Sequence, residues 1–164
     1  MSAPAPLHIC NVEVALWRGE HWLLIRRGSG ERHAADQLAL VGGKVEHDDA
    51  AGSVLEDALR REIAEETGLK AECDFTYVAS TRFTLEDGTS VVDVVFCAPC
   101  PEGRPAVQDS AEVAAITWLT AGQVALSDAP SWTKEYVARA ETVRRSHPTV
   151  VPTTKTGDAG HARA

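Results

Sequence analysis

The segment that decides the fold is Arg61-Glu62-Ile63-Ala64-Glu65-Glu66-Thr67-Gly68-Leu69. On a helix, steps of three and four residues bring side chains onto one face, so Glu62, Glu65 and Glu66 crowd a single patch. Like charges that lie this close repel one another. A divalent cation with oxygen ligands offsets such repulsion, and the sequence therefore predicts a cation site on this helix.

The same acids lie on the side of the helix that is expected to face the core. At roughly 100° per residue, Leu55 and Leu59 fall within about 60° of Glu62. An ordinary solvated helix carries its acids on the opposite side. Carboxylates at the edge of a core lose hydration and need protons or partners. The alternative is a salt-bridged surface helix in which Arg61 pairs with Glu65 at i, i+4.

Composition limits the class of protein. The length of 164 residues suggests one domain, and the 44% of apolar residues is enough for one sizeable core. The formal charge of −8 disfavours a nucleic-acid partner, because phosphate backbones bind basic surfaces. A small phosphorylated substrate stays compatible, since a bound cation and a few arginines reverse the sign locally.

The ends of the chain and its hydropathy bear on location. No apolar run is long enough to span a membrane, and residues 1–6 lack the basic and apolar regions of a signal peptide. We therefore expect a cytoplasmic protein without a membrane partner. We predict a flexible N-terminus at residues 1–6, a single domain at residues 7–146 and a disordered tail at residues 147–164. The oligomeric state is left open, with a homodimer as one alternative.

The cysteines offer a second candidate site. Cys97 and Cys100 have the spacing of a redox or zinc pair. They follow an expected strand and lead into a Pro/Gly-rich loop, whereas redox pairs usually open a helix that lowers the thiol pKa. No second closely spaced pair is present to complete a zinc site. A zinc or redox protein is therefore the least favoured class.

Hydrophobic periodicity predicts six strands and two helices. We expect the strands at residues 9–16, 22–26, 38–41, 74–85, 90–97 and 112–119. One helix is expected at residues 53–67, with Ser53 as N-cap and Gly68 as C-terminal stop, and another at residues 132–145. Loops are expected at the glycines 42–43 and at residues 46–52. Strands around a central helix, with a second helix at the end, indicate a mixed sheet with helices on both faces.

The glycine-rich segment before the helix completes a longer pattern. Gly42-Gly43-Lys44-Val45-Glu46, taken together with residues 61–69, resembles the signature of the Nudix hydrolases. The second half matches that family's pattern Arg-Glu-apolar-x-Glu-Glu-x-Gly-apolar at every position. The resemblance implies the family's α/β fold, an α/β/α sandwich with a mixed β-sheet between helices.

The chain departs from the family pattern in one place. The pattern has a glutamate in the loop before the arginine, and no glutamate stands at that place here. The loop of residues 46–53 is longer than usual, and Asp49 is the candidate substitute. This departure motivates an alternative hypothesis, in which the protein is a non-catalytic Nudix-fold nucleotide sensor or interaction module.

The resemblance implies hydrolysis of the pyrophosphate linkage in a nucleoside diphosphate derivative, either a nucleoside triphosphate or a nucleotide sugar. It implies Mg²⁺, with Mn²⁺ as a substitute, held by Glu62, Glu65, Glu66 and the backbone carbonyl of Gly42. The catalytic residues implied are Glu62, Glu65 and Arg61, with Arg61 orienting Glu65 or a nearby carboxylate. The partner implied is a small nucleotide-type substrate.

The general base stays open between three acids. Glu62 is a candidate general base if it does not bind the cation. Glu112 and Asp109 are candidates if an acid on a loop reaches the attacking water. For both loop acids, a solvated charge is the alternative.

Phosphate contacts require cations outside the signature. Arg26 or Arg27 ranks first, and by strand alternation only one of them can face the site. Arg82 ranks next, and Lys44 lies within the expected glycine loop. A solvated strand face is the alternative for each. No proline or tyrosine follows at the offsets that mark some Nudix subfamilies, so ADP-ribose and dinucleoside polyphosphates are not favoured.

Overall fold

Two long strands joined by a tight turn begin the sheet. β1 (Ile9–Arg18) and β2 (His21–Arg27) pair antiparallel, with Leu16 opposite Leu23. Gly19 in the turn has a φ of 60°, a conformation that favours glycine. The structure is a computed structural model that describes residues 7–31, 34–49 and 52–147.

One half of the sheet is built on β1. β6 (Ser90–Pro99) runs parallel to β1, and β5 (Thr76–Thr84) pairs antiparallel with β6 at the outer edge. β4 (Val41–Lys44) pairs antiparallel with the first half of β1. The order on this side is therefore β5, β6, β1 and β4.

The other half is built on β2. β7 (Val113–Thr120) pairs with its whole length, and β3 (Leu38–Ala39) pairs with its end. The chain crosses from this half to the first half at Leu40, between β3 and β4. The two halves of the sheet therefore separate beside β4. The edge of β4 that does not pair with β1 is left open to side chains from other elements.

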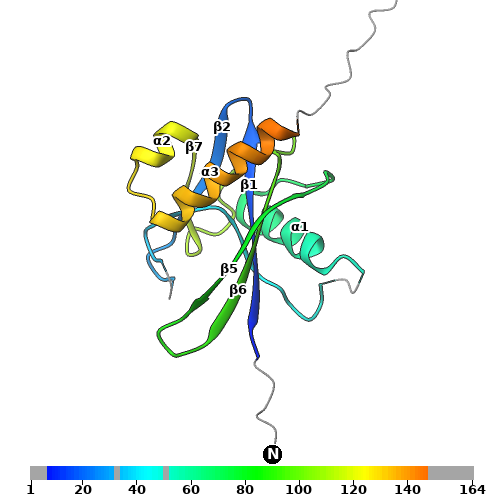
Figure 1. Ribbon diagram of the computed structural model, residues 1–164, viewed down its shortest axis with the longest axis vertical. Helices are drawn as coiled ribbons and strands as arrows, with labels where there is room; N and C mark the ends of the chain where they lie inside the picture. The colour runs from blue at the N-terminus through cyan, green and yellow to red at the C-terminus, as the bar shows by residue number, and fades with distance from the viewer. Residues whose placement is uncertain (1–6, 32–33, 50–51, 148–164) are drawn as a thin grey trace, which may run out of the picture.

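Helices cover both faces of the sheet (Figure 1). α1 (Val54–Thr67) packs Leu59 and Ile63 into the core on one face. α3 (Ser131–Ser146) packs Tyr136 on the other face. This layering confirms the predicted α/β/α sandwich with a mixed sheet.

Side chains of β1 alternate between the two cores. Val12, Val14 and Leu16 belong to the cluster under α1. Ala15 belongs to the cluster under α3, and Trp17 packs against it. Residues 11 and 13 therefore project to the α3 face of the sheet.

The prediction of a glycine loop at residues 42–44 is wrong. Gly43 pairs with Val12 and Lys44 pairs with Asn11, so these residues form β4. Glycine is a poor strand former, which hides the strand from a reading by propensity. The pairing with β1 stabilises the extended conformation that the local sequence does not favour.

A short helix was not expected from periodicity. α2 (Ala121–Leu126) begins after Thr120, whose hydroxyl accepts a hydrogen bond from the Gln123 N–H at 3.2 Å. The Gln123 side chain returns a bond to the Thr120 N–H at 2.9 Å, which completes a capping box. The signal was present in the sequence, but the helix buries only Val124.

The predicted ends of the central helix are correct in position. α1 begins directly after Ser53, although the Ser53 side chain makes no capping hydrogen bond. It ends at Gly68, where φ is 71° and the N–H donates to the Ala64 carbonyl at 2.9 Å. A glycine is needed there because few other residues adopt this conformation.

The cysteine pair does not assemble. Cys97 is buried in the cluster under α3, whereas Cys100 packs against the cluster under α1. All four cysteines are free thiols. No helix in the described part of the chain is long and apolar enough to cross a membrane. The tail predicted to be disordered lies outside the described residues apart from His147, and residues 1–6 lie outside them entirely.

Candidate functional site

The acidic end of α1 lies against the core. Glu62 and Glu66 are 9% and 7% exposed and share the buried face of the helix with Ile63. Glu65 differs, because its side chain is 52% exposed. The helical phase thus predicted the placement of Glu62 and Glu66 correctly, whereas Glu65 reaches solvent from the same end of the helix.

β4 runs beside these acids, and its glycines let them approach the main chain. A Cβ at Gly43 would lie 2.5 Å from the carboxyl carbon of Glu62, closer than such atoms come. The Gly42 N–H donates to Glu66 Oε2 at 3.0 Å. Because the N–H and C=O groups of one strand residue point to the same edge, the Gly42 carbonyl also faces the side of Glu66. Carboxylate and carbonyl oxygens therefore gather at one edge of β4.

Arg61 lies among the acids. Its Nη1 donates to Glu62 Oε1 at 2.7 Å and to Glu65 Oε2 at 3.2 Å. Its Nη2 donates to the Lys44 carbonyl at 2.8 Å. Its Nε and Nη2 also face the two oxygens of Asp49, at 3.1 and 3.3 Å. Arg61 therefore makes the i, i+4 pair with Glu65 and also pairs with three further carboxylates, those of Glu62, Asp49 and, at 3.8 Å, Glu46.

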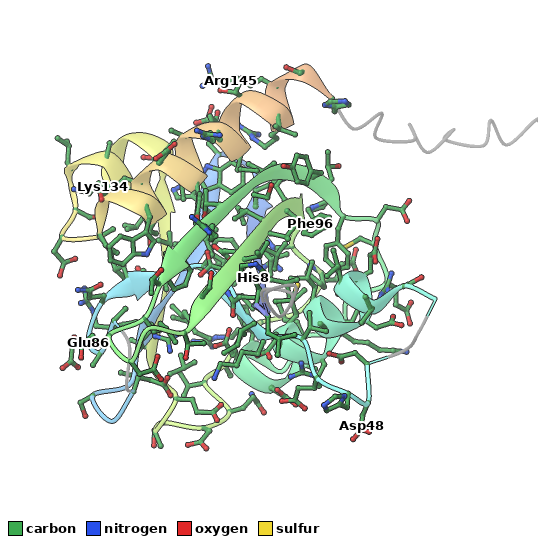
Figure 2. All side chains as sticks on the ribbon, turned by 60° about the horizontal axis from the view of Figure 1, so that its bottom comes forward. His8, Asp48, Glu86, Phe96, Lys134 and Arg145 are labelled. Carbon is green, nitrogen blue, oxygen red and sulfur yellow. The ribbon has the colours of Figure 1, made fainter. Side chains whose placement is uncertain are left out.

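Asp49 projects from the lengthened loop toward the helix. Its side chain is 5% exposed, and its Oδ2 accepts a hydrogen bond from the Glu46 N–H at 2.7 Å. Arg61, followed by the Glu46 N–H, holds the pKa of Asp49 below its usual value. Figure 2 shows this loop, marked by Asp48, beside α1 and far from α3. The longer loop thus places Asp49, whose side chain is one methylene shorter than that of glutamate, beside Arg61.

Burial raises the pKa of both inward acids of α1. Loss of hydration raises the pKa of Glu66 to about 8 from an ordinary 4.5, although the Gly42 N–H counteracts part of the rise. Burial also raises the pKa of Glu62, against the opposing effect of Arg61. A desolvated carboxylate is stabilised by a proton or a cation. These two acids therefore have the properties expected of cation ligands.

The donor set suits a hard cation. Within the described residues, no group of three or more His, Cys, Asp or Glu side chains already has the arrangement of a metal site. Arg61 Nη1 contacts both Glu62 and Glu65. The oxygens at this place are nevertheless carboxylate and carbonyl oxygens, which Mg²⁺ and Mn²⁺ prefer. The residues present therefore fit such an ion.

The two arginines at the end of β2 go to different sides. Arg26 donates to the Asp36 carbonyl at 2.5 Å and pairs with Asp128 at 3.1 Å, near the start of α3. Arg27 pairs with Glu31, and its charge counteracts the raised pKa of Glu66. Alternation predicted that only one arginine faces the acids, and Arg27 is the one whose charge acts on Glu66.

Lys44 and Arg82 are less closely associated with these acids. The Lys44 carbonyl accepts from Arg61, but its side chain is exposed at the end of β4. Arg82 is exposed on β5, and β6 and β1 lie between β5 and β4. Because neighbouring strands lie about 4.8 Å apart, the backbone of Arg82 is about 14 Å from β4. The structure therefore does not join Arg82 to the acids of α1.

The two loop acids before β7 have different surroundings. The Asp109 carboxylate accepts from the Ala111 N–H at 2.8 Å and so stabilises the turn. Glu112 has a carbonyl that accepts from the Gly28 N–H at 2.7 Å, and its side-chain charge raises the pKa of Glu66. Of the two acids, Glu112 is the one placed to act near α1.

A polar row on the α3 face of the sheet was missed by sequence reasoning. The row consists of Asn11, Asp93, Thr81 and Tyr136. Asn11 and Thr81 are the register partners of Asp93 on either side, so the three share a face. Asn11 donates to Asp93 at 2.9 Å, and the Tyr136 hydroxyl bonds to Thr81 at 2.6 Å and to Asp93. An aspartate inside the apolar run of residues 91–96 was the available signal.

Glu13 lies beside this polar row. It follows Asn11 by two residues on β1 and is the register partner of Gly42. Burial, and next Asp93, raise its pKa well above the usual value, while Arg27 opposes the rise and Glu66 adds to it. Glu13 is therefore within electrostatic reach of both the polar row and the acids of α1.

Comparison with known proteins identifies the family. The family model described as NUDIX domain matches residues 8–140. The comparison with curated proteins found no match. Because the matched region covers most of the chain, this protein belongs to the NUDIX domain family, as the sequence resemblance predicted.

Solved structures share the fold. A MutT NUDIX hydrolase from Burkholderia pseudomallei is 24% identical with a TM-score of 0.69, over 81% of this chain and 98% of that one. The NUDIX domain of Shewanella oneidensis NrtR, complexed with ADP ribose, is 16% identical with a TM-score of 0.68, over 84% and 88%. A UDP-X diphosphatase is 24% identical with a TM-score of 0.66, over 89% and 66%. At these identities the likeness establishes the fold.

Proposed function

We propose that this protein hydrolyses the pyrophosphate linkage of a nucleoside triphosphate or a nucleotide sugar with the help of Mg²⁺ or Mn²⁺. The observation that carries the proposal is the burial of Glu62 and Glu66 beside the glycines of β4. A divalent cation neutralises such carboxylates, and it neutralises the phosphates of a polyanionic substrate at the same time. Nudix hydrolases generally use a divalent metal such as Mg²⁺. Neighbours named MutT NUDIX hydrolase and UDP-X diphosphatase support the same reaction class.

In this proposal Glu62, Glu65, Glu66 and the Gly42 carbonyl hold the cation. When bound, the cation neutralises phosphate charge and lowers the pKa of water. The Gly42 N–H keeps the Glu66 carboxylate at the edge of β4. Gly43 leaves room for Glu62, because any side chain there would overlap its carboxylate.

Two arginines have separate roles. Arg61 is a positioning residue, since it contacts Glu62 and Glu65 and is itself held by both oxygens of Asp49. Asp49 thus takes the place of the absent glutamate. Arg27 is the residue proposed to contact the substrate phosphates, because it lies within electrostatic reach of Glu66.

The general base is narrowed to two acids. Asp109 uses its carboxylate in the turn before β7, which disfavours it. Glu62 and Glu112 stay as candidates for taking the proton of the attacking water. Replacing each with Gln distinguishes the two roles: loss of the base removes the acidic limb of the kcat–pH profile, whereas loss of a ligand raises the metal concentration that is required.

The decisive experiment concerns Glu65. A panel of nucleoside triphosphates and nucleotide sugars is incubated with Mg²⁺, and release of phosphate or nucleoside monophosphate is followed. Glu65→Gln is expected to lower turnover by about a hundredfold, as when a group that stabilises transition-state charge is removed. Because the Glu65 side chain is exposed, the unfolding temperature of the variant should equal that of the wild type. The matched control is Glu135→Gln, an exposed i, i+4 acid on α3. Equal turnover in the two variants would refute the assignment.

The alternative is a nucleotide sensor or interaction module without catalysis. The neighbour complexed with ADP ribose is a NUDIX domain with a bound nucleotide, which makes this alternative concrete. Calorimetric binding of a nucleotide with no hydrolysis of the panel would favour it. The cytoplasmic location and the homodimer stay predictions.

A further inference from the structure

Glu13 is a partly buried acid without a hydrogen-bond partner for its side chain among residues 7–31, 34–49 and 52–147. Buried polar groups are normally hydrogen-bonded, so a partly buried acid without a protein partner is left to a water molecule, an ion or a ligand. Its neighbours on the same face satisfy one another, because Asn11 donates to Asp93 and Tyr136 bonds to Asp93. Glu13 is therefore free to accept a hydrogen bond from a molecule outside the fold.

The position of Glu13 connects it to the candidate active site. Glu13 is the register partner of Gly42, whose N–H holds Glu66. Arg27 and Glu66 both act electrostatically on Glu13. A substrate that places its diphosphate near Arg27 and Glu66 can therefore extend its other end toward Glu13.

The chemistry of a carboxylate limits what that end can be. Phosphate is excluded, because two negative groups repel each other. A second divalent cation is disfavoured, since it takes about six oxygen ligands and Asp93 is already engaged by Asn11 and Tyr136. Two adjacent acceptor oxygens suit two adjacent donors. On a nucleotide these donors are neighbouring N–H groups on the base or the two hydroxyls of ribose.

We propose, on the basis of the proposed function, that Glu13 is a specificity-determining residue that accepts hydrogen bonds from paired donors on the nucleoside part of the substrate. A substrate without those donors leaves the carboxylate desolvated and unpaired, which costs binding free energy. Selectivity at Glu13 is thus separate from the chemistry at α1, where the phosphates react.

The test uses pairs of substrates that differ only in the hydrogen-bond donors they carry. Guanosine and inosine triphosphates differ in the 2-amino group, and cytidine and uridine triphosphates differ in the amino group at C4. Each ribonucleotide is also compared with its 2′,3′-dideoxy form, which lacks the hydroxyls. The base pairs and the sugar pairs thereby distinguish the two sources of donors. The measured quantity is the ratio of kcat/KM within each pair, for the wild type, Glu13→Gln, Glu13→Val and the exposed control Glu20→Gln.

We expect the wild type to prefer the donor-bearing member of at least one pair by about tenfold or more, the effect of a hydrogen bond to a charged group. Both Glu13 variants should bring that ratio close to one, and Glu20→Gln should keep it. Removal of a partly buried charge that has no protein partner should leave the unfolding temperature unchanged or higher. Unchanged ratios in both Glu13 variants, or a lower unfolding temperature with unchanged ratios, overturn the role of Glu13 in specificity and leave the hydrolase proposal intact. Absence of turnover in the wild type overturns the proposed function itself.

Discussion

α1 and α3 flank the same sheet and both carry acids, but they place these acids differently. On α3, Glu135 pairs with Arg139 at 2.6 Å, and both side chains are about half exposed. On α1, Glu62 and Glu66 turn inward and are almost wholly buried. Solvated pairs contribute little to stability, whereas buried carboxylates cost free energy unless they gain a partner. The contrast indicates that α3 serves packing and that α1 is shaped for binding.

The largest effect is expected at Glu66. Glu66→Gln keeps the size of the side chain and an acceptor for the Gly42 N–H, but removes the charge that a cation requires. Turnover should fall about a thousandfold. Steady-state kinetics with Mg²⁺ measure the effect beside Glu135→Gln on α3. If both variants keep wild-type rates, the two helices do not differ in function.

The second effect is a pH dependence of stability in the metal-free protein. Because burial raises the pKa of Glu66 to about 8 from 4.5, the folded state binds this proton more tightly than the unfolded state. The stabilisation is fully present below pH 4.5 and is lost as pH rises through about 8, a change of about 5 kcal/mol at most.

Urea unfolding at a series of pH values with a chelator measures this loss. Glu66→Gln should flatten the profile, and Mg²⁺ should restore stability at high pH by binding the carboxylate. A wild-type profile no steeper than that of the variant contradicts the burial of a titrating acid on α1.

The third effect concerns the space between α1 and β4. Gly43→Ala places a methyl group 2.5 Å from the carboxyl carbon of Glu62 and must displace it. We expect kcat/KM to fall about tenfold to a hundredfold, as for a disturbed metal ligand. Gly122→Ala in α2 is the control, because its methyl group meets no atom closer than 4.0 Å. Unaltered Mn²⁺ binding in the Gly43 variant would show that Glu62 needs no such space.

A smaller effect is expected at Asp49. Asp49→Asn removes the charge that faces Arg61 while keeping the size of the side chain. The loss in kcat should be about tenfold, the lower range for a residue that orients a ligand. Asp48→Asn, an exposed neighbour in the same loop, serves as the control. Activity equal to that control would show that the lengthened loop carries no substitute for the missing glutamate.

The smallest effect is expected on α3. Glu135→Gln breaks a solvent-exposed ion pair with Arg139, so the free energy of unfolding should change by less than about 0.5 kcal/mol. Chemical denaturation at moderate salt measures the change. A loss of several kcal/mol would mean that Glu135 is not a simple surface charge.

Local signals account for the parts of the fold that were predicted correctly. The bounds of α1 were predicted from Ser53, Gly68 and an apolar stripe, all within one segment, although the Ser53 side chain makes no capping hydrogen bond. β4 was missed because Gly42 and Gly43 become a strand only through pairing with β1. α2 was missed because a six-residue helix that buries only Val124 has too little periodicity to detect.

The site divides in the same way. The inward placement of Glu62 and Glu66 could be computed from helical phase, because it depends on one regular element. The choice of Arg27 over Arg26 could not, since it depends on Asp128 and on a bulge in the pairing of β2 with β7. These partners lie far away along the chain.

By itself the sequence determined the family, the central helix and the acids that this helix presents, because short-range periodicity and a contiguous pattern encode them. Only the tertiary structure decided that Asp49 reaches Arg61, that the charge of Arg27 acts on Glu66 and that Glu13 adjoins Gly42. The physical reason is that such contacts arise from strand register and loop path, which distant segments set jointly.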